Sequence, residues 1–443
     1  MDWLGKVHIR RTKTIRFFES SSAILPCGGV ILNEFDIVIK NAKISENTIL
    51  DIGIKNGKIQ KLGKLDDGLN TINAEGRFVL NGFVNSHCHL DKSNLLDRMG
   101  EGQFGKSLEE NRRLLKEVKS TYSKKDIENR ASIAIEKMLS KGVTAIRTQV
   151  DVDPTCGLVP LEALLEIKKK YEDRVLIEIS AFPQEGVIGD EKNELIEKAI
   201  EKGANVVGGL PLVEDKSNQK KHLNNIFEIA KKYGKSLDIQ IDESNDPRTS
   251  MLPELIKKTS EEKLFNRVNV THAIALSRFP TKMALGYIDE MARLGMSVIV
   301  TPSANMITRF VEESDVWMRP SNSITRVTEL CDKGIKVSLG TDNIRDVFYP
   351  FGNCSMIREL HMLISATRMT SKDHIEKAFE MATKNGAELL GLNYGIESGK
   401  DADLIITNSF SKIDILNNDE IVLCTIKNGV IQCIHESMLR RDN

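Results

Sequence analysis

The chain has 443 residues, 40% hydrophobic and 28% charged, as in an ordinary globular protein with a sizeable core. Its net charge of −1 gives no reason to expect nucleic acid or an anionic membrane as partner, and no run approaches the roughly 20 apolar residues of a membrane helix. The length fits one α/β barrel with an accessory domain, or two to three ordinary domains.

The N-terminus and the cysteines bear on the compartment. Residues 1–18 hold five basic residues and one acidic residue, but no apolar stretch with a small-residue cleavage site follows. We therefore expect residues 1–29 to be an N-terminal extension. The seven cysteines are scattered and include no C-x-x-C pair, so neither a disulfide framework nor a structural zinc site is indicated. A reducing cytoplasm is the expected location.

Both ends of the chain are rich in predicted β-strands. Alternating or short apolar runs, broken by Asn and Gly, cover residues 30–80. The pair Asn56-Gly57 predicts a hairpin, because both central residues of a type I′ turn need positive φ. The same style returns at 402–408 and 421–434, again with an Asn428-Gly429 pair. The two ends therefore predict one composite β domain, a small β-sandwich formed by residues 30–80 plus 397–435.

The middle of the chain alternates short apolar runs with amphipathic segments of helical period. Near-continuous Val, Ile and Leu runs are typical of parallel strands buried on both faces. Eight such alternations favour a closed (β/α)8 TIM barrel, assigned to residues 81–396, over an open sheet. The predicted strands are 83–90, 143–152, 175–182, 205–213, 236–243, 267–274, 296–303 and 336–343.

Polar side chains at the carboxyl ends of these strands mark the expected active site, because in such barrels these ends face it. His87 and His89 alternate along the first strand, so both imidazoles lie on one face and can bind one metal ion together. Asp342 ends the eighth strand, which neighbours the first in a closed barrel, so it can reach the same ion. Further acid–base or ligand types stand at other strand ends: Gln184 follows the third strand, Gln240 to Glu243 end the fifth, and the sixth carries His272.

This arrangement resembles the amidohydrolase superfamily and, within it, cytosine deaminase. The resemblance covers roughly residues 30–435, and the pieces AFPQEG and GTDNIRDVFYPFGN favour cytosine deaminase over other members. The similar pieces are GFVNSHCHLDKS (82–93), AIRTQVDVDPT (145–155), AFPQEG (181–186), DIQIDESND (238–246), VNVTHAIAL (268–276), GTDNIRDVFYPFGN (340–353) and GIESGKDADLII (395–406).

The resemblance implies a metal-dependent hydrolase of C–N bonds that deaminates an amino-substituted nitrogen heterocycle. His87, His89 and Asp342 match the ligands of one divalent metal ion, zinc or iron, with manganese as a further option. Asp342 also matches the group that accepts a proton from the attacking water, and His272 the group that hydrogen-bonds the hydroxide. Glu243 matches the residue that carries protons to the ring nitrogen.

The resemblance also places residues around the substrate. Gln184 matches the glutamine that hydrogen-bonds the pyrimidine. Asn343 stands near the amino leaving group, where cytosine deaminase has aspartate. Phe182 and Phe348 are expected to be pocket walls. The implied partner is a small-molecule substrate, with no nucleic acid and no membrane, and a homo-oligomer stays open because relatives are often dimers or larger.

Several family histidines are replaced in this chain. The family's fourth metal ligand precedes the strand-five glutamate by three residues, and Gln240 stands there, although an amide oxygen is a poor substitute for imidazole on zinc or ferrous iron. Gln149 and Thr341 also stand where cytosine deaminase has histidine. Three hypotheses remain: a deaminase of a heterocycle other than cytosine, a hydrolase of a substituted amine or cyclic amide, and a metal-free relative that binds a small molecule without hydrolysing it.

Overall fold

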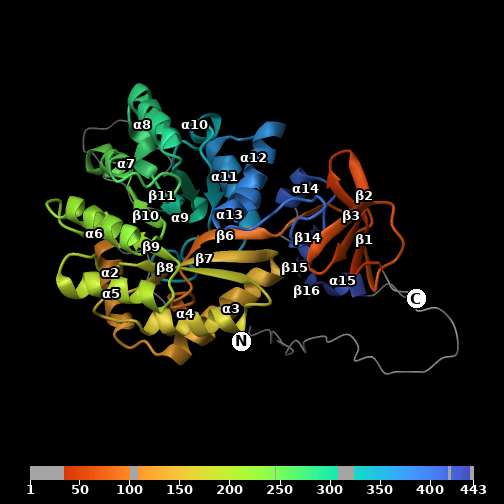
Figure 1. The fold of residues 1–443 in the computed structure, drawn as a ribbon, viewed down its shortest axis with the longest axis horizontal. Coiled ribbons are helices and arrows are strands. Elements are labelled where there is room, and N and C mark those ends of the chain that lie inside the picture. The colour runs from red at the N-terminus through yellow and green to blue at the C-terminus, as the bar shows by residue number, and fades with distance from the viewer. Residues whose placement is uncertain (1–33, 100–107, 245, 308–323, 418–420, 440–443) are drawn as a thin grey trace, which may run out of the picture.

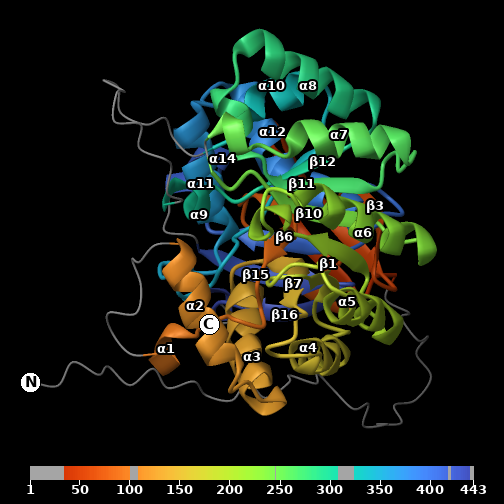
Figure 2. The same cartoon turned by 90° about the vertical axis from the view of Figure 1, so that its left-hand side faces the viewer.

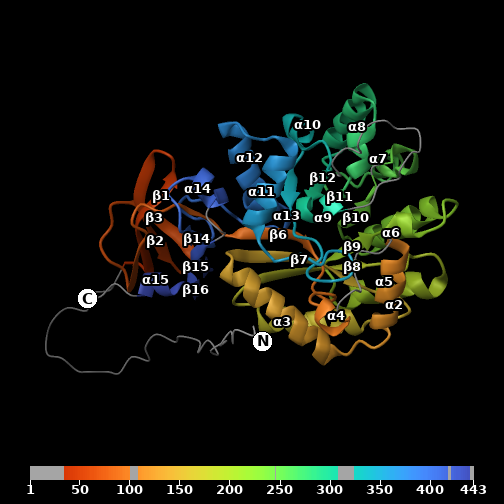
Figure 3. The same ribbon diagram turned by 180° about the vertical axis from the view of Figure 1, so that it is seen from behind.

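A computed structural model describes residues 34–99, 108–244, 246–307, 324–417 and 421–439. The predicted N-terminal extension, residues 1–29, lies outside the described residues. The chain forms a large α/β part and, beside it, a smaller β part in which the first and last strands lie together (Figures 1 and 3). No helix of the described residues has the length and apolar character needed to cross a membrane.

The large part is the predicted (β/α)8 barrel. Its eight parallel strands follow chain order around the sheet, and all eight predicted strands are present. A parallel bridge between Cys88 and Asp342 brings the first and last strands together, and the Asp342 amide donates to the His87 carbonyl over 2.9 Å. The strands are β6 (Phe83–Cys88), β7 (Val143–Asp151), β8 (Leu176–Phe182), β9 (Val206–Gly209), β10 (Leu237–Ile241), β11 (Val268–His272), β12 (Ser297–Val300) and β13 (Val337–Leu339).

The meeting of β13 with β6 depends on a glycine. A Cβ atom on Gly340 would lie 2.6 Å from the carbonyl oxygen of His87, closer than real Cβ contacts come. Only glycine allows the two backbones to approach this closely. Gly340 therefore helps to set His87 and Asp342, which flank the junction, against each other.

Helices surround the barrel strands, as the view in Figure 2 shows. Their apolar side chains recur at three- and four-residue spacing, as in α3, where Ile127, Ala131, Ala134 and Met138 are buried. These helices are α1 (Leu96–Met99), α2 (Leu108–Lys119), α3 (Lys124–Ser140), α4 (Val159–Lys170), α5 (Asp190–Lys202), α6 (Gln219–Lys232), α7 (Leu252–Glu261), α8 (Thr281–Arg293), α9 (Pro302–Ile307), α10 (Val327–Asp332), α11 (Met356–Thr367), α12 (Lys372–Ala382) and α13 (Lys384–Leu389).

The smaller part contains two four-stranded sheets that share one apolar core. Ile39 and Ile54 from the start of the chain pack in the same cluster as Leu404 and Ile426 from its end. This confirms a small β-sandwich made from both ends, while the boundaries 30–80, 81–396 and 397–435 stay predictions. The sheets are β3-β2-β1-β4 and β16-β15-β14-β5, from β1 (Ile37–Ser45), β2 (Thr48–Lys55), β3 (Lys58–Gly63), β4 (Asn70–Asn73), β5 (Val79–Asn81), β14 (Leu404–Thr407), β15 (Val422–Lys427) and β16 (Val430–Ile434). Two short helices, α14 (Lys412–Asn417) and α15 (Glu436–Leu439), complete the C-terminal segment.

Both predicted Asn-Gly hairpin turns are confirmed. Asn56 and Gly57 have φ of 50° and 73° and join β2 to β3, while Asn428 and Gly429 have φ of 48° and 69° and join β15 to β16. Asn and Gly adopt this left-handed conformation most readily, which explains why these pairs mark the turns.

Candidate active site

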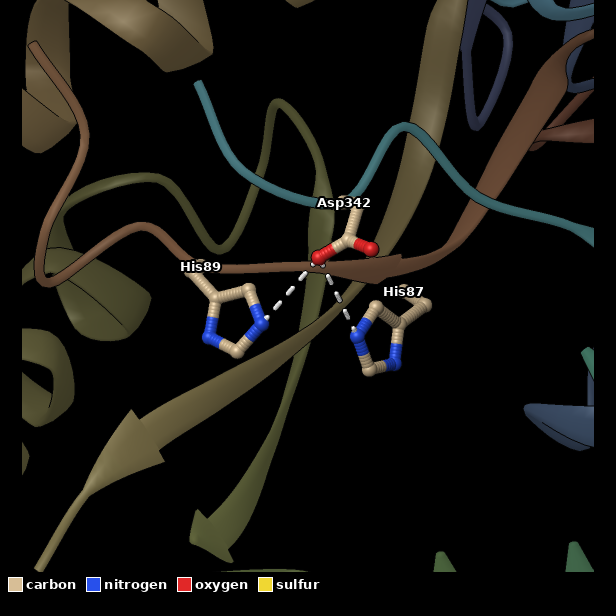
Figure 4. Close-up of side chains that lie close together, drawn as sticks. All are labelled: His87, His89 and Asp342. Carbon is tan, nitrogen blue, oxygen red and sulfur yellow. Dashed lines mark ion pairs between the residues drawn. The ribbon is translucent and has the colours of Figure 1, made fainter. Parts of the chain in front are cut away.

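Two histidines and an aspartate converge at the carboxyl end of the barrel, as the sequence predicts. His87 lies within β6 and His89 just after it, while Asp342 lies three residues beyond β13. The Oδ1 atom of Asp342 lies 3.7 Å from His87 Nε2 and 3.3 Å from His89 Nε2 (Figure 4). All three side chains are buried, and their ligand atoms lie within 4.8 Å of one another.

The protonation states of this cluster suit a divalent metal ion. Burial lowers the pKa of both His87 and His89, so each imidazole is neutral near pH 7 and offers a lone pair. Burial alone would raise the pKa of Asp342, but a hydrogen bond with His89 and the electrostatic effect of His87 and His272 hold that pKa well below its usual range. Two neutral imidazoles and one carboxylate are a donor set that zinc, iron and manganese accept.

Gln240, at the predicted fourth-ligand position, reaches the same cluster. It lies on β10, and its Nε2 atom lies 3.1 Å from His87 Nε2 and 3.3 Å from His89 Nε2. A half-turn of the amide group would bring Oε1 to this point, because the two ends of a carboxamide have nearly the same shape. The barrel therefore places an amide where the family resemblance expects an imidazole.

The predicted acid–base residues His272 and Glu243 face each other beside the cluster. His272 ends β11, Glu243 follows β10, and His272 Nε2 lies 3.7 Å from Glu243 Oε1. On the other side of the ring, the Asn305 amide lies 3.0 Å from His272 Nδ1 and donates to it. An accepting Nδ1 leaves the ring proton on Nε2, where it points toward Glu243.

Thr301 connects His272 to Asp342. Its hydroxyl donates to Asp342 Oδ2 over 3.1 Å and lies 3.2 Å from His272 Nδ1. Thr301 directly follows β12 and is buried. This contact occupies Oδ2 of Asp342, so that Oδ1 is the oxygen that faces the two imidazoles.

The backbone around the cluster is strained. Asp242, His272, Ala273 and Asp342 are not glycines, yet their φ values are 55°, 74°, 49° and 59°. This left-handed conformation costs energy in residues that carry a Cβ, and such residues cluster at functional sites where surrounding structure holds them in place. The strain occurs where strands β10, β11 and β13 give way to the loops that bear polar groups, so it re-aims those side chains.

A cavity of about 510 Å³ opens over the cluster. It is lined by most of the predicted site residues: His89, Gln184, Gln240, Glu243, His272, Asp342, Asn343 and Phe348. Asn343 donates from Nδ2 to Asp346 over 2.6 Å, which fixes its amide. The barrel therefore brings the expected metal, acid–base and substrate positions to one cavity.

Phe182 departs from the expectation of a pocket wall. It is buried at the end of β8 and is absent from the described residues that line the cavity. Its ring instead packs edge-on against His89, with the ring centroids 5.6 Å apart. Phe182 therefore packs against a metal-site imidazole instead of lining the cavity.

Lys92 is a cavity residue that the sequence reasoning missed. Its fully buried ammonium donates to Asp151 Oδ1 over 2.7 Å and to Gln184 Oε1 over 2.9 Å. Burial opposes its charge, but the carboxylates of Asp151 and Asp91 outweigh burial and raise the Lys92 pKa. The signal was its place in HCHLDKS, three residues after His89. Thr301 and Asn305 were missed as well, because they follow a strand whose end carries no titratable residue.

Residues 78–431 match the family model described as the amidohydrolase family. The chain belongs to the amidohydrolase family. Its predicted family is therefore confirmed, as is the predicted reaction class of a hydrolase acting on C–N bonds.

Individual relatives resemble this chain over 78% or more of their own length. A curated relative, N-isopropylammelide isopropyl amidohydrolase of Pseudomonas sp. (strain ADP), is 29% identical over 90% of this chain and 97% of its own. Pterin deaminase of Rhizobium rhizogenes is 23% identical over 77% of this chain and 78% of its own. The structure of 5-methylcytosine deaminase from Klebsiella pneumoniae aligns with a TM-score of 0.82 and 27% identity, over 90% of this chain and 98% of the other.

Proposed function

We propose that this amidohydrolase is a metal-dependent aminohydrolase, which replaces an amino group on a nitrogen heterocycle with oxygen and releases ammonia. The observation that carries the proposal is the convergence of His87, His89 and Asp342 at the base of a cavity that Glu243 and His272 also line; His87 itself is buried beneath that lining. The similarity to 5-methylcytosine deaminase and pterin deaminase supports a heterocycle as the substrate.

One divalent ion, zinc or iron with manganese as a further option, would be held by His87, His89 and Asp342. Gln240 would act as a weaker fourth ligand through its amide oxygen, which lacks the basicity of an imidazole nitrogen. When bound, such an ion lowers the pKa of water from about 15.7 toward roughly 7, so hydroxide forms at neutral pH.

The side chains around the cavity would move the protons. Asp342, held ionised, accepts a proton from the attacking water. His272 would donate a hydrogen bond to the attacking oxygen from Nε2. This nitrogen carries the ring proton when Asn305 donates to Nδ1. The water oxygen would add to the ring carbon, one water proton would reach the adjacent ring nitrogen through Glu243, and the proton taken by Asp342 would pass to the amino nitrogen. The C–N bond would then break with release of ammonia. General acid–base groups of this kind are worth about 10²–10⁴-fold in rate.

Gln184 and Lys92 would orient the ring. The Gln184 oxygen already accepts from Lys92, so its amide nitrogen is left to donate to a ring nitrogen or carbonyl oxygen. Asn343, fixed by Asp346, and Phe348 would close the cavity on the side of the leaving group. Phe182 contributes by packing behind His89.

A second candidate is release of a substituted amine, and a specific finding favours it. The N-isopropylammelide hydrolase relative matches this chain over 97% of its own length. The same residues would serve this reaction, with an alkylamine as the leaving group in place of ammonia. The two candidates differ in what the cavity accepts next to the scissile C–N bond.

The test is metal analysis of the purified protein, followed by assays for ammonia and for alkylamine on pyrimidines, purines, pterins and N-alkylated triazines. Ammonia release that is lost with chelator and restored by metal supports the deaminase, and alkylamine release supports the second candidate. A protein that binds these compounds without metal or turnover would contradict both and favour the non-catalytic hypothesis.

We also propose a cytoplasmic location, with which the six free cysteines of the described residues agree.

A further inference from the structure

A second cavity adjoins the candidate active site. It measures about 370 Å³, and Arg112 and Gln184 line both cavities. The second cavity is strongly cationic, with five basic residues and one acidic residue in its lining: Arg112, Arg113, Lys116, Lys119, Lys192 and Glu185. The mechanism proposed above makes no use of this charge.

Three of the five cations are already neutralised. Arg113 pairs with Glu117 one turn further along α2. Lys116 lies 3.1 Å from Glu185, and buried Lys119 pairs with Asp153. These side chains therefore leave no charge to be balanced by a ligand.

Neither Arg112 nor Lys192 forms an ion pair with a carboxylate of the described residues, although the charge of Lys192 acts on Glu214 from a distance. Lys192 donates over 2.5 Å to the backbone carbonyl of Glu185, which is an uncharged acceptor. The Nε atom of Arg112 is buried and has no hydrogen-bond partner within the described part of the chain. A buried polar atom without a partner costs free energy, and more so when the group is charged. Both cations line the second cavity together with Gln184, which also lines the first.

The chemistry of these two groups selects an anion. A guanidinium presents a planar fork that matches a carboxylate or phosphate with two parallel hydrogen bonds, and an ammonium adds a point charge. The cavity lined by His89 and Asp342 is also large for one small ring, since pockets of about 300–1,000 Å³ typically enclose drug-sized ligands. A ring at the His–Asp cluster thus leaves room for a substituent that reaches Arg112.

We infer that the substrate is an amino-substituted heterocycle carrying an anionic substituent, a carboxylate or a phosphate, that binds between Arg112 and Lys192. This inference rests on the proposed function, because it takes the ring to lie at His87, His89 and Asp342. The anionic end is then held at the junction of the cavities, and Gln184 lies between the two ends.

The test compares neutral and anionic forms of one ring. Dissociation constants of pterin, 6-carboxypterin and 6-hydroxymethylpterin phosphate are measured by calorimetry on metal-loaded wild type, Arg112→Gln, Lys192→Gln and Arg113→Gln. We expect wild type to bind an anionic form about tenfold or more tightly than pterin, since a hydrogen bond to a charged group is worth about 1.5–3 kcal/mol. Arg112→Gln should remove most of this preference and Lys192→Gln part of it. Arg113→Gln, which changes a paired cation of the same cavity, should leave it intact.

The relative affinity of the carboxylate and phosphate forms identifies which anion the site prefers. Equal binding of neutral and anionic forms by wild type, or binding of neither anionic form, overturns the inference. Loss of pterin affinity in Arg112→Gln by the same factor would also overturn it, because the residue would then support the fold or the ring. Tight binding of an anionic form without any release of ammonia or amine would contradict the proposed function while leaving the anion site standing.

Discussion

Gln240 stands at the position of a metal ligand, but its amide is a much weaker ligand for a metal ion than an imidazole. It lies 3.1 Å and 3.3 Å from the two imidazole nitrogens that face the cluster. We expect Gln240→His to tighten metal binding by about tenfold or more. Mutation of a group that only hydrogen-bonds to a metal ligand already changes metal affinity by about 10–100-fold, and a direct ligand should matter at least as much. Competition with a chelating dye measures the affinity.

A Gln240→Leu variant serves as the matched control, since it keeps the bulk of the side chain and removes its oxygen. Its metal affinity should fall below that of wild type. If both variants bind metal as wild type does, Gln240 lies outside the coordination sphere.

Glu243 should affect the rate without affecting metal content. Its carboxylate faces His272 at 3.7 Å, and it is not part of the described His–His–Asp cluster. Glu243→Gln is expected to lower kcat by about 10²–10⁴-fold, the usual contribution of a general acid–base group, with the metal retained. Asp342→Asn should instead lose both metal and activity. Steady-state kinetics with metal analysis separate the two effects, and loss of metal from Glu243→Gln would assign it to the metal site.

Residues whose position follows from strand geometry were predictable, and those placed by loops or helices were not. His87, His89 and Asp342 were found because side chains alternate along a strand and because the first and last strands of a closed barrel are neighbours. Lys92 lies beyond the end of β6, and Arg112 reaches the site from α2, so no periodicity relates either to the cluster. Phe182 was misplaced because its type suggests a wall, whereas its direction is set by packing against His89.

At the scale of elements, the eight barrel strands were predictable because each is a compact apolar run followed by an amphipathic helix. Their ends were less so. The predicted strand 205–213 ends at Gly209 and continues into a 3₁₀ helix at Pro211–Val213, and the predicted strand 296–303 ends at Val300 before α9. In both places a proline stands near the start of the new turn, since its fixed φ and missing N–H suit the first turn of a helix.

The short helix α9 is tied to α11 by a buried acid, which predicts a pH effect on stability. Glu359 of α11 accepts a hydrogen bond from the Ser303 amide over 2.9 Å. Burial raises the Glu359 pKa from an ordinary value of 4.5 to about 8. The folded state therefore holds this proton more tightly than the unfolded chain, so the contribution of Glu359 to stability falls as pH rises from 4.5 to about 8.

Glu359→Gln should remove this loss, because glutamine keeps an accepting oxygen and carries no charge. The variant is expected to gain stability relative to wild type as the pH rises from 5 to 9, by about 1.4 kcal/mol for each pH unit over which Glu359 is ionised in the unfolded chain but still protonated in the folded one. Urea unfolding at the two pH values measures the difference. Glu380→Gln, at an exposed position of α12, is the control and should follow the wild-type profile. A constant difference between Glu359→Gln and wild type at both pH values would contradict the prediction.

At the scale of the whole molecule, a buried chain of polar groups joins the barrel to the composite sandwich. The Thr144 hydroxyl on β7 lies 2.6 Å from the Tyr394 hydroxyl, which donates to Asp403 Oδ2 over 3.0 Å. Lys427 of β15 donates to the same oxygen over 2.5 Å, and the Asn428 amide donates to Asp403 Oδ1. One carboxylate therefore holds together residues that are far apart in the sequence and lie in both parts of the fold.

Asp403→Ala should destabilise the protein by about 3–5 kcal/mol, because removing one partner leaves the other as an uncompensated buried charge. Lys427 is that partner, and its side chain is only 4% exposed. Urea unfolding followed by far-ultraviolet circular dichroism and by the fluorescence of a tryptophan introduced into the sandwich measures the loss. Glu117→Ala breaks an ion pair in which both side chains are more than half exposed. It is the control and should change the stability little.

Because Asp403 bonds to both parts, we expect the unfolding transitions reported by the two probes to shift together. A sandwich probe that shifts alone would mean that the two parts unfold independently, and that Asp403 stabilises only the strands on which it lies.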